Sequence, residues 1–231
     1  MPNQIHTVLF DLDGTLADTA PDMAYALNRV REEQGLAPLA YSAIRPVVSH
    51  GATALVRLGL DIEAEDARFA ALRQRFLDIY REHLARETRL FPGMGEVLDI
   101  IEQRGMNWGV VTNKPAWLTD PLMEQLGLTS RAACVVSGDT TPERKPHPAP
   151  MLYACHRAGS QSWQCLYIGD AQRDIEAGKR AGMKTLAALF GYIGEADEPH
   201  AWDADGMIRH PLEILDWISN PDLAGNPCRA G

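Results

Sequence analysis

The chain has 231 residues, a hydrophobic content of 45%, a formal net charge of -9 and a pI near 5.2. This much apolar material is enough for a packed core, so we expect a globular protein. The acidic balance disfavours broad binding to nucleic acid or to anionic membranes, because both need a cationic surface. An anionic ligand could still bind through local positive charge.

No stretch approaches the roughly 18 apolar residues of a transmembrane helix, and the segment MPNQIHTVLF lacks the features of a secretion signal. We therefore expect a cytoplasmic monomer or homodimer with no nucleic-acid or membrane partner. The four cysteines, Cys134, Cys155, Cys165 and Cys228, show no CxxC spacing. We expect the first three to be buried free thiols, because a chain of this length needs no disulfides.

Short apolar runs recur along the chain and predict strands that are buried on both faces, as in a parallel sheet. They lie at 8–10, 108–111, 133–136, 165–168 and 185–189. Helical patterns alternate with them, for example the apolar spacing over 94–101 that stops before Gly105, and the pattern over 175–181 before Gly182. This alternation predicts an α/β fold with right-handed crossovers and a doubly wound, Rossmann-like parallel sheet.

Residues 16–86 break the alternation, because they show helical patterns and no convincing strand. We therefore expect a helical domain at 16–86, inserted into a Rossmann-like core made of residues 1–15 and 87–219. Residues 88–94 would return the chain to the core. Residues 220–231, rich in Gly, Pro and Asn, would form a mobile tail.

Polar residues follow four of the apolar runs. In an open parallel sheet, ligands bind at the carboxyl ends of the strands, so we expect these residues to meet there. They are Asp11 to Thr15, Thr112 with Asn113, Lys145, and Asp170 with Asp174. Together they predict a phosphoryl-transfer site.

The carboxylates of this group would repel one another and call for a cation. Oxygen ligands without histidine or cysteine favour Mg²⁺ over zinc. Asp11 and Asp170 are the first candidate ligands, and the backbone carbonyl of Asp13 is a third. Asp174 would support these ligands without binding the metal directly, or would reach the metal through a water molecule. Asp11 is also the candidate nucleophile that forms an aspartyl-phosphate, and Asp13 the candidate general acid and base. Gly14 allows the tight turn that aims Asp13 at the site.

A transferring phosphoryl group carries negative charge that preorganised donors must meet. Thr112, Lys145 and neighbouring backbone N–H groups are the candidates, and Asn113 is grouped with them as a substrate-binding residue. Ordinary structural roles are the alternatives. Thr112 and Asn113 could cap a helix, and Lys145 could lie on the surface. Asp170 and Asp174 could supply a helix cap and a solvated acidic face.

The motifs DLDGT, VVTN, KP and GDxxxD, in this order, resemble those of the haloacid dehalogenase-like superfamily over the chain to about residue 219. The resemblance implies that the inserted helices form a cap that closes over the substrate. It also implies the following roles: Asp11 as nucleophile, Asp13 as acid and base, Thr112 and Lys145 as phosphate ligands, and Asp11, Asp13 and Asp170 around Mg²⁺.

Several activities of that superfamily can be compared with these residues. Asp13 favours phosphate chemistry over dehalogenation, because a halide leaving group needs no acid. Phosphonate hydrolases of the family use a cap lysine, and the first lysine here is Lys114, beyond the cap. A sugar phosphomutase shares the DxDGT pair and stays open. So does a phosphate-accepting signalling domain, although neither Asp13 nor a cap has a use there.

Among phosphatases the chain resembles the phosphoglycolate phosphatase group. More narrowly, segments 108–115 and 191–205 resemble the bacterial N-acetylmuramic acid 6-phosphate phosphatases of peptidoglycan recycling. The resemblance implies a phosphomonoesterase for a small anionic sugar phosphate, first N-acetylmuramic acid 6-phosphate and alternatively phosphoglycolate.

Substrate choice is expected to depend on the loop VVSHGAT at 47–53, with Arg45 nearby. Gly51 would let the backbone approach a ligand, while Ser49, His50 and Arg45 would offer hydrogen-bond donors to a carboxylate or sugar. The alternatives are a capping or surface role for His50 and a solvated Arg45.

Overall fold

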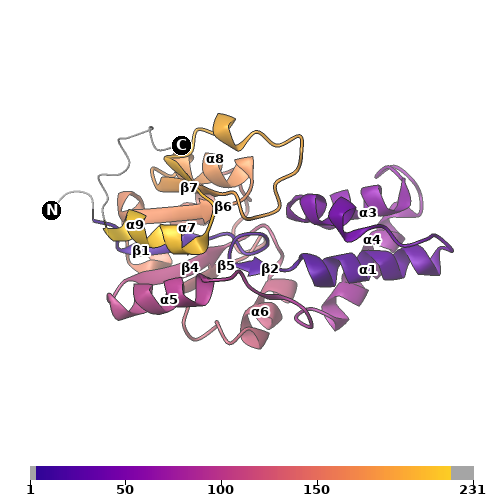
Figure 1. Cartoon of the computed structure of the whole chain (residues 1–231), viewed down its shortest axis with the longest axis horizontal. Helices are drawn as coiled ribbons and strands as arrows, with labels where there is room; N and C mark the ends of the chain where they lie inside the picture. Colours follow the sequence, from indigo (N-terminus) through magenta and orange to yellow (C-terminus); the bar gives the residue numbers. More distant parts are fainter. Residues whose placement is uncertain (1–3, 220–231) are drawn as a thin grey trace.

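Six parallel strands form the central sheet in this computed structural model, which describes residues 4–219 (Figure 1). The strand order is β5-β4-β1-β6-β7-β8, which places β1 between β4 and β6. The strands are β1 (Thr7–Phe10), β4 (Asn107–Val111), β5 (Cys134–Val136), β6 (Cys165–Gly169), β7 (Lys184–Ala188) and β8 (Gly206–Ile208). This is the doubly wound α/β fold that the sequence predicts.

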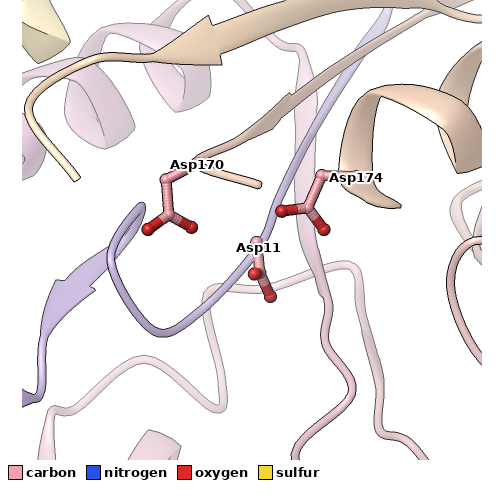
Figure 2. Close-up of side chains that lie close together, drawn as sticks. All are labelled: Asp11, Asp170 and Asp174. Carbon is pink, nitrogen blue, oxygen red and sulfur yellow. The ribbon is translucent and has the colours of Figure 1, made fainter. Parts of the chain in front are cut away.

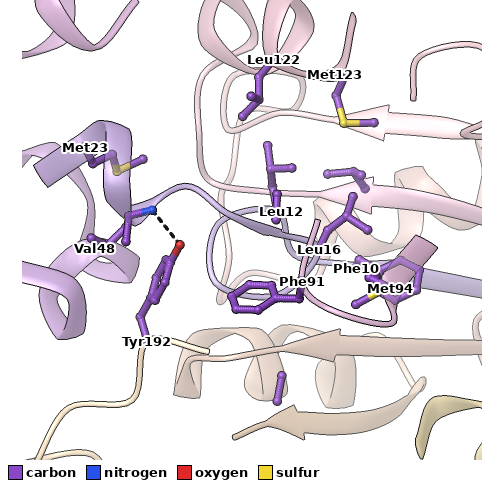
Figure 3. Close-up of a cluster of buried hydrophobic side chains, with 14 of the residues drawn as sticks. Phe10, Leu12, Leu16, Met23, Val48, Phe91, Met94, Leu122, Met123 and Tyr192 are labelled. Carbon is purple, nitrogen blue, oxygen red and sulfur yellow. Dashed lines mark hydrogen bonds between the residues drawn. The ribbon is translucent and has the colours of Figure 1, made fainter. Parts of the chain in front are cut away.

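Both faces of the sheet are covered, and this explains why its strands are continuous apolar runs. In β1, Val8 and Phe10 belong to one core cluster together with helix α5 (Met94–Gln103). Leu9 belongs to a second cluster with α7 (Ala149–Ala158). Figure 3 shows part of the first cluster. Alternate residues of one strand therefore fill opposite layers of the core.

Helices follow the strands as the apolar periodicity predicts. Helix α5 ends just before Gly105, whose φ of 68° lies in the left-handed region that favours glycine. Gly182 takes the same conformation after α8, with a φ of 77°. The remaining core helices are α6 (Ala116–Gln125), α8 (Gln172–Arg180) and α9 (Ile214–Ser219).

Helices α1, α3 and α4 lie side by side, beyond the edge of the sheet at which the carboxyl end of β1 lies (Figure 1). We call residues 20–82 the helical segment. Its buried side chains include Leu27 of α1 and Tyr80 of α4, which continue the first core cluster. Its elements are α1 (Ala20–Glu33), α2 (Tyr41–Ile44), the 3-10 helix η1 (Arg45–His50), α3 (Gly51–Leu60) and α4 (Phe69–Glu82).

The structure adds three short strands that the sequence analysis missed. β2 (Ala17–Asp18) and β3 (Arg89–Leu90) pair antiparallel where the chain enters and leaves the helical segment. The expectation of no strand within 16–86 is therefore wrong at β2. β8 was also missed, because strands of two or three residues are too short to show a period.

Three cysteines, Cys134, Cys155 and Cys165, are buried and free, as predicted. Cys228 and the expected tail at 220–231 lie outside the described residues. Within residues 4–219, no helix is both long enough and apolar enough to span a bilayer.

Candidate active site

The three central strands end in polar residues that meet at one edge of the sheet. Asp11 follows β1, Thr112 follows β4 and Asp170 follows β6, and these strands are neighbours. All three side chains are buried. This convergence is what parallel strands impose on the residues that follow them.

Asp11, Asp170 and Asp174 form a buried carboxylate cluster (Figure 2). One oxygen from each lies within 4.8 Å of the others. Burial, together with the charges of Asp11 and Asp174, raises the pKa of Asp170 to about 7. Burial also raises the pKa of Asp174, against the opposing charge of Lys145. The alternative of a solvated acidic face is therefore wrong for Asp170 and Asp174.

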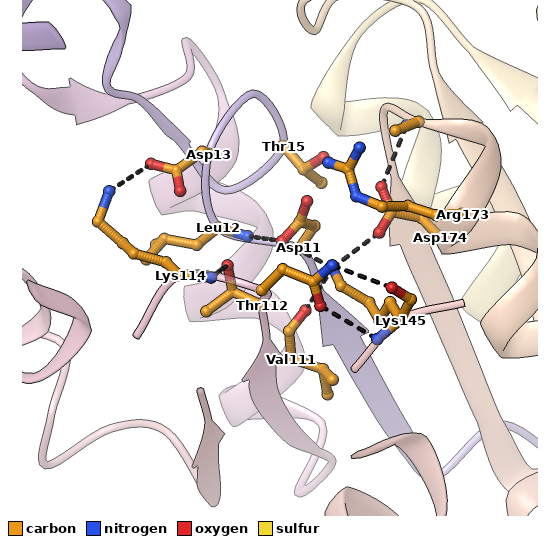
Figure 4. Close-up of polar contacts among 12 residues, drawn as sticks. Asp11, Leu12, Asp13, Thr15, Val111, Thr112, Lys114, Lys145, Arg173 and Asp174 are labelled. Atoms are coloured by element: carbon orange, nitrogen blue, oxygen red, sulfur yellow. Dashed lines mark hydrogen bonds and ion pairs between the residues drawn. The ribbon is translucent and has the colours of Figure 1, made fainter. Parts of the chain in front are cut away.

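Lys145 is buried beside this cluster and is not a surface lysine. Its Nζ lies 2.9 Å from Asp11 Oδ1 and 2.7 Å from Asp174 Oδ1. It also donates to the Val111 carbonyl at 2.8 Å (Figure 4) and to the Tyr167 hydroxyl at 2.8 Å. The ammonium group thus neutralises part of the carboxylate charge, as buried ion pairs require.

The loop after β4 organises the residues around it. The Asn113 amide donates to the Lys145 carbonyl at 3.0 Å and accepts from the Lys145 N–H at 3.1 Å. Thr112 Oγ1 accepts a hydrogen bond from the backbone N–H of Lys114 at 3.2 Å. Helix α6 begins at Ala116 with Pro115 as its N-cap, so neither Thr112 nor Asn113 caps it.

Asp13 lies on the other side of Asp11 and belongs to a separate polar group. Its Oδ1 accepts from Thr19 Oγ1 at 2.7 Å and from Lys114 Nζ at 2.9 Å. Gly14 follows with a φ of 85°, and a Cβ at this position would overlap the Asp170 carboxylate. The structure therefore bears out the need for glycine behind the two aspartates.

The end of η1 docks on the carboxylate cluster. Ser49 Oγ donates to Asp170 Oδ2 at 2.6 Å, and the Arg173 guanidinium donates to the Ser49 carbonyl at 2.7 Å. His50 and Gly51 follow, and Gly51 has a φ of 79°. These bonds connect the helical segment to the ends of β6 and α8.

Arg45, at the start of η1, contacts the segment that follows β7. Its guanidinium donates to the carbonyls of Phe190 and Gly191, at 3.1 and 3.0 Å, and lies 5.0 Å from the ring centre of Tyr192. The Tyr192 hydroxyl in turn accepts from the backbone at the start of α1 (Figure 3). Arg45 is half-buried, anchors the helical segment to the core, and does not line the pocket.

A pocket of about 630 Å³ opens between the helical segment and the sheet edge. Seven predicted site residues line it: Asp11, Asp13, Ser49, His50, Gly51, Thr112 and Asn113. Four others do not: Arg45, Lys145, Asp170 and Asp174. The last three of these are buried and lie close to Asp11.

Four cationic side chains also line the pocket, although the chain as a whole carries a charge of -9. They are Arg73, Lys114, Arg144 and Arg173. Sequence reasoning assigned none of them to the site. Lys114 stands directly after the VVTN motif in a chain with only four lysines, and this position could have identified it.

Comparison with known proteins agrees with this geometry. The family model described as haloacid dehalogenase-like hydrolase matches residues 8–188. An N-acetylmuramic acid 6-phosphate phosphatase from Pseudomonas aeruginosa is 43% identical over 213 residues, covering 92% of this chain and 94% of the relative. A phosphoglycolate phosphatase from Xanthomonas campestris pv. campestris is 43% identical over 212 residues, covering 90% of this chain and 94% of that relative.

Among solved structures, one titled a "predicted phosphoglycolate phosphatase" from Haemophilus somnus 129pt has a TM-score of 0.82 and 29% sequence identity. The match covers 92% of this chain and 97% of that one. The curated relatives named above are phosphatases, and the similarity extends over both the sheet and the helical segment. The chain therefore belongs to the haloacid dehalogenase-like hydrolase family.

Proposed function

We propose that the protein is a Mg²⁺-dependent phosphomonoesterase that works through an aspartyl-phosphate on Asp11. One observation carries the proposal: Asp11 and Asp13 both line the pocket, while Asp11 also belongs to a buried cluster of three carboxylates. Membership of a hydrolase family whose curated relatives include phosphatases supports this reading. Residues 16–86 would act as the cap over the substrate.

The donor set of the cluster fits Mg²⁺. Three buried carboxylates share one small space with no histidine or cysteine among them, and hard oxygen donors of this kind suit a small divalent cation. Asp11, Asp170 and the backbone carbonyl of Asp13 would hold the ion, with Asp174 behind them. When bound, the ion would offset the repulsion between these carboxylates and an incoming phosphate.

The protein's own groups would carry the two steps. An oxygen of Asp11 attacks phosphorus, the bond from phosphorus to the leaving oxygen breaks, and Asp13 gives that oxygen a proton. Asp13 then takes a proton from water as the water attacks phosphorus, which releases phosphate and the free Asp11 carboxylate. Thr112 lines the pocket, and Lys145 lies 2.9 Å from Asp11 Oδ1, so both would support the transferred group.

The pocket favours a carboxylated sugar phosphate as substrate. Its volume of about 630 Å³ far exceeds what a two-carbon acid phosphate would fill, and the half-exposed Trp117, which lines it, would pack against a sugar ring. Arg73 of α4 also lines it, and within residues 4–219 its guanidinium has no hydrogen-bond or ion-pair partner. A substrate carboxylate would supply one.

The names of the relatives agree with this choice and leave one alternative. N-acetylmuramic acid 6-phosphate combines a sugar ring, a phosphate and a carboxylate, and a relative at 43% identity is named for it. Phosphoglycolate is the alternative, because a relative at the same identity is named for that substrate.

The test is phosphate release from N-acetylmuramic acid 6-phosphate, phosphoglycolate and glucose 6-phosphate, compared by kcat/KM with Mg²⁺ and with a chelator. We expect the highest value for the first substrate and no turnover with the chelator. A tenfold preference for phosphoglycolate would overturn the substrate choice, and turnover that survives the chelator would overturn the Mg²⁺ requirement.

Arg73→Met sharpens this test. A charged hydrogen bond contributes about 1.5 to 3 kcal/mol, so kcat/KM should fall roughly 10- to 100-fold for the two carboxylated substrates and little for glucose 6-phosphate. Arg75→Met is the matched control, because Arg75 lies on the same helix and pairs with Glu33 away from the pocket. Equal losses for all three substrates would show that Arg73 does not read the carboxylate.

A further inference from the structure

Lys114 is a buried lysine to which the family motifs assign no role. Its side chain is only 4% exposed, and its backbone is tied down from two sides. Its N–H donates to Thr112 Oγ1, and its carbonyl accepts from the Gly138 N–H at 2.8 Å and from Thr119 Oγ1 at 3.2 Å. A lysine held this firmly places its ammonium group at a defined point.

That point lies between the core and the helical segment. Lys114 Nζ donates to Asp13 Oδ1 at 2.9 Å and to the Tyr80 hydroxyl of α4 at 2.9 Å (Figure 4 shows the first of these bonds). Tyr80 is 1% exposed, and burial raises its pKa to about 12, so the phenol stays neutral. Burial acts to lower the pKa of Lys114, but the Asp13 carboxylate and the Tyr80 hydroxyl together outweigh it, so the net pKa is raised and Lys114 stays charged.

The two carboxylate oxygens of Asp13 differ in their hydrogen bonds. Oδ1 accepts two hydrogen bonds, from Thr19 Oγ1 and from Lys114 Nζ. Among the described residues, nothing hydrogen-bonds to Oδ2, and Asp13 lines the pocket. A proton carried by Asp13 must therefore sit on Oδ2, because both neighbours of Oδ1 already donate to it.

We propose that Lys114 is the positioning residue for the acid and base Asp13: it holds Oδ1, leaves Oδ2 to exchange protons in the pocket, and is itself held by Tyr80. The inference rests on the proposed function, since it assigns the proton transfers to Asp13. Loss of Lys114 frees the carboxyl to rotate, and both proton transfers slow as a result.

Pre-steady-state kinetics with 4-nitrophenyl phosphate test this in the Mg²⁺-loaded full-length enzyme. The nitrophenolate leaving group needs no proton, whereas hydrolysis of the aspartyl-phosphate still needs Asp13. Lys114→Met should therefore release a burst of about one nitrophenolate per enzyme molecule, followed by turnover roughly 10- to 100-fold slower than wild type. Asp13→Asn should show the same burst and serves as the reference.

Two further variants keep the test decisive. Tyr80→Phe removes only a hydroxyl and should show the same burst with a smaller loss of turnover, so it replaces Lys114→Met if that variant does not fold. Lys184→Met is the control and should behave as wild type. It breaks an ion pair with Asp205, and neither of these residues lines the pocket.

The outcomes separate the two proposals. Wild-type enzyme that releases no phosphate from any ester would overturn the proposed function. Active wild type, together with a Lys114→Met variant that shows a raised KM, an unchanged kcat and no burst, would overturn the inference and make Lys114 a substrate-binding residue. A Lys114→Met variant that matches Lys184→Met would overturn it as well.

Discussion

Two buried lysines lie at the same edge of the sheet, and each pairs with one aspartate of the DLDGT motif. The Lys145 ammonium group contacts Asp11, Asp174, Val111 and Tyr167, which all belong to the core. Lys114 instead bridges Asp13 and the helical segment, and it lines the pocket.

The difference shows how one kind of ion pair can serve two purposes. Beside the carboxylate cluster, the main requirement is to balance negative charge that burial makes costly. Beside Asp13, which is 14% exposed and paired with a single cation, the main requirement is orientation. The following predictions test this contrast, beginning with the largest expected effect.

Asp11→Asn should reduce turnover by a factor on the order of 10⁴ to 10⁶, the scale seen when a nucleophile is lost. Asp13→Asn should reduce it less, roughly 10²- to 10⁴-fold, because only the proton transfers are affected. Steady-state phosphate release measures both. Near-normal turnover of Asp11→Asn would contradict the assignment of the nucleophile.

Lys145→Met should destabilise the metal-free protein by about 3 to 5 kcal/mol, because it removes the ammonium group that contacts both Asp11 and Asp174 and leaves only the charge of Arg173 to offset these buried carboxylates. Urea unfolding in a chelator measures this, with Lys184→Met as the control for loss of a partly exposed pair. Lys114→Met should cost less, since Asp13 can be partly hydrated. Equal losses for the two buried lysines would remove the distinction drawn above.

The raised pKa of Asp170 predicts that the stability of the metal-free protein depends on pH. Its folded pKa of about 7 exceeds the ordinary value of 3.8, so between these values the folded state binds more protons than the unfolded state. The contribution of Asp170 to the free energy of unfolding therefore falls as the pH rises from about 4 to 7. Asp170→Asn should remove this slope.

Urea unfolding at pH 5 and pH 8, in a chelator, measures the effect as the difference between wild type and variant. Asp170→Asn should be relatively more stable at pH 8 than at pH 5. It should also lose the stabilisation that Mg²⁺ gives the wild type. An unchanged response to Mg²⁺ would exclude Asp170 as a ligand.

Ser49→Ala should have the smallest effect of this set. It removes one donor to Asp170 while Tyr192 still supplies a backbone N–H at 2.9 Å. We expect a stability loss of about 1 kcal/mol and a change in kcat/KM of less than tenfold. Ser42→Ala, at an exposed position of α2, is the matched control. A larger loss of turnover would mean that this hydroxyl acts on the substrate.

The amino-acid sequence by itself predicted five of the six strands of the sheet and the residues at its edge. The apolar runs predict strands buried on both faces, and parallel strands bring the residues that follow them to one side. Asp11, Thr112 and Asp170 could therefore be placed together without any structure. Residues 47–53 could be predicted as neighbours of the site from Gly51 and the donors Ser49 and His50, but they form the end of η1 and the start of α3 and not the expected loop.

Only the tertiary structure decided which partner each side chain has. Asp13 and Lys114 are 101 residues apart along the chain, and Ser49 and Asp170 are 121 apart. Arg45 has the same donors whether it faces a ligand or the carbonyls of Phe190 and Gly191. Strand periodicity specifies where the backbone runs, whereas these contacts depend on how the helical segment packs against the sheet, and no local pattern records that packing.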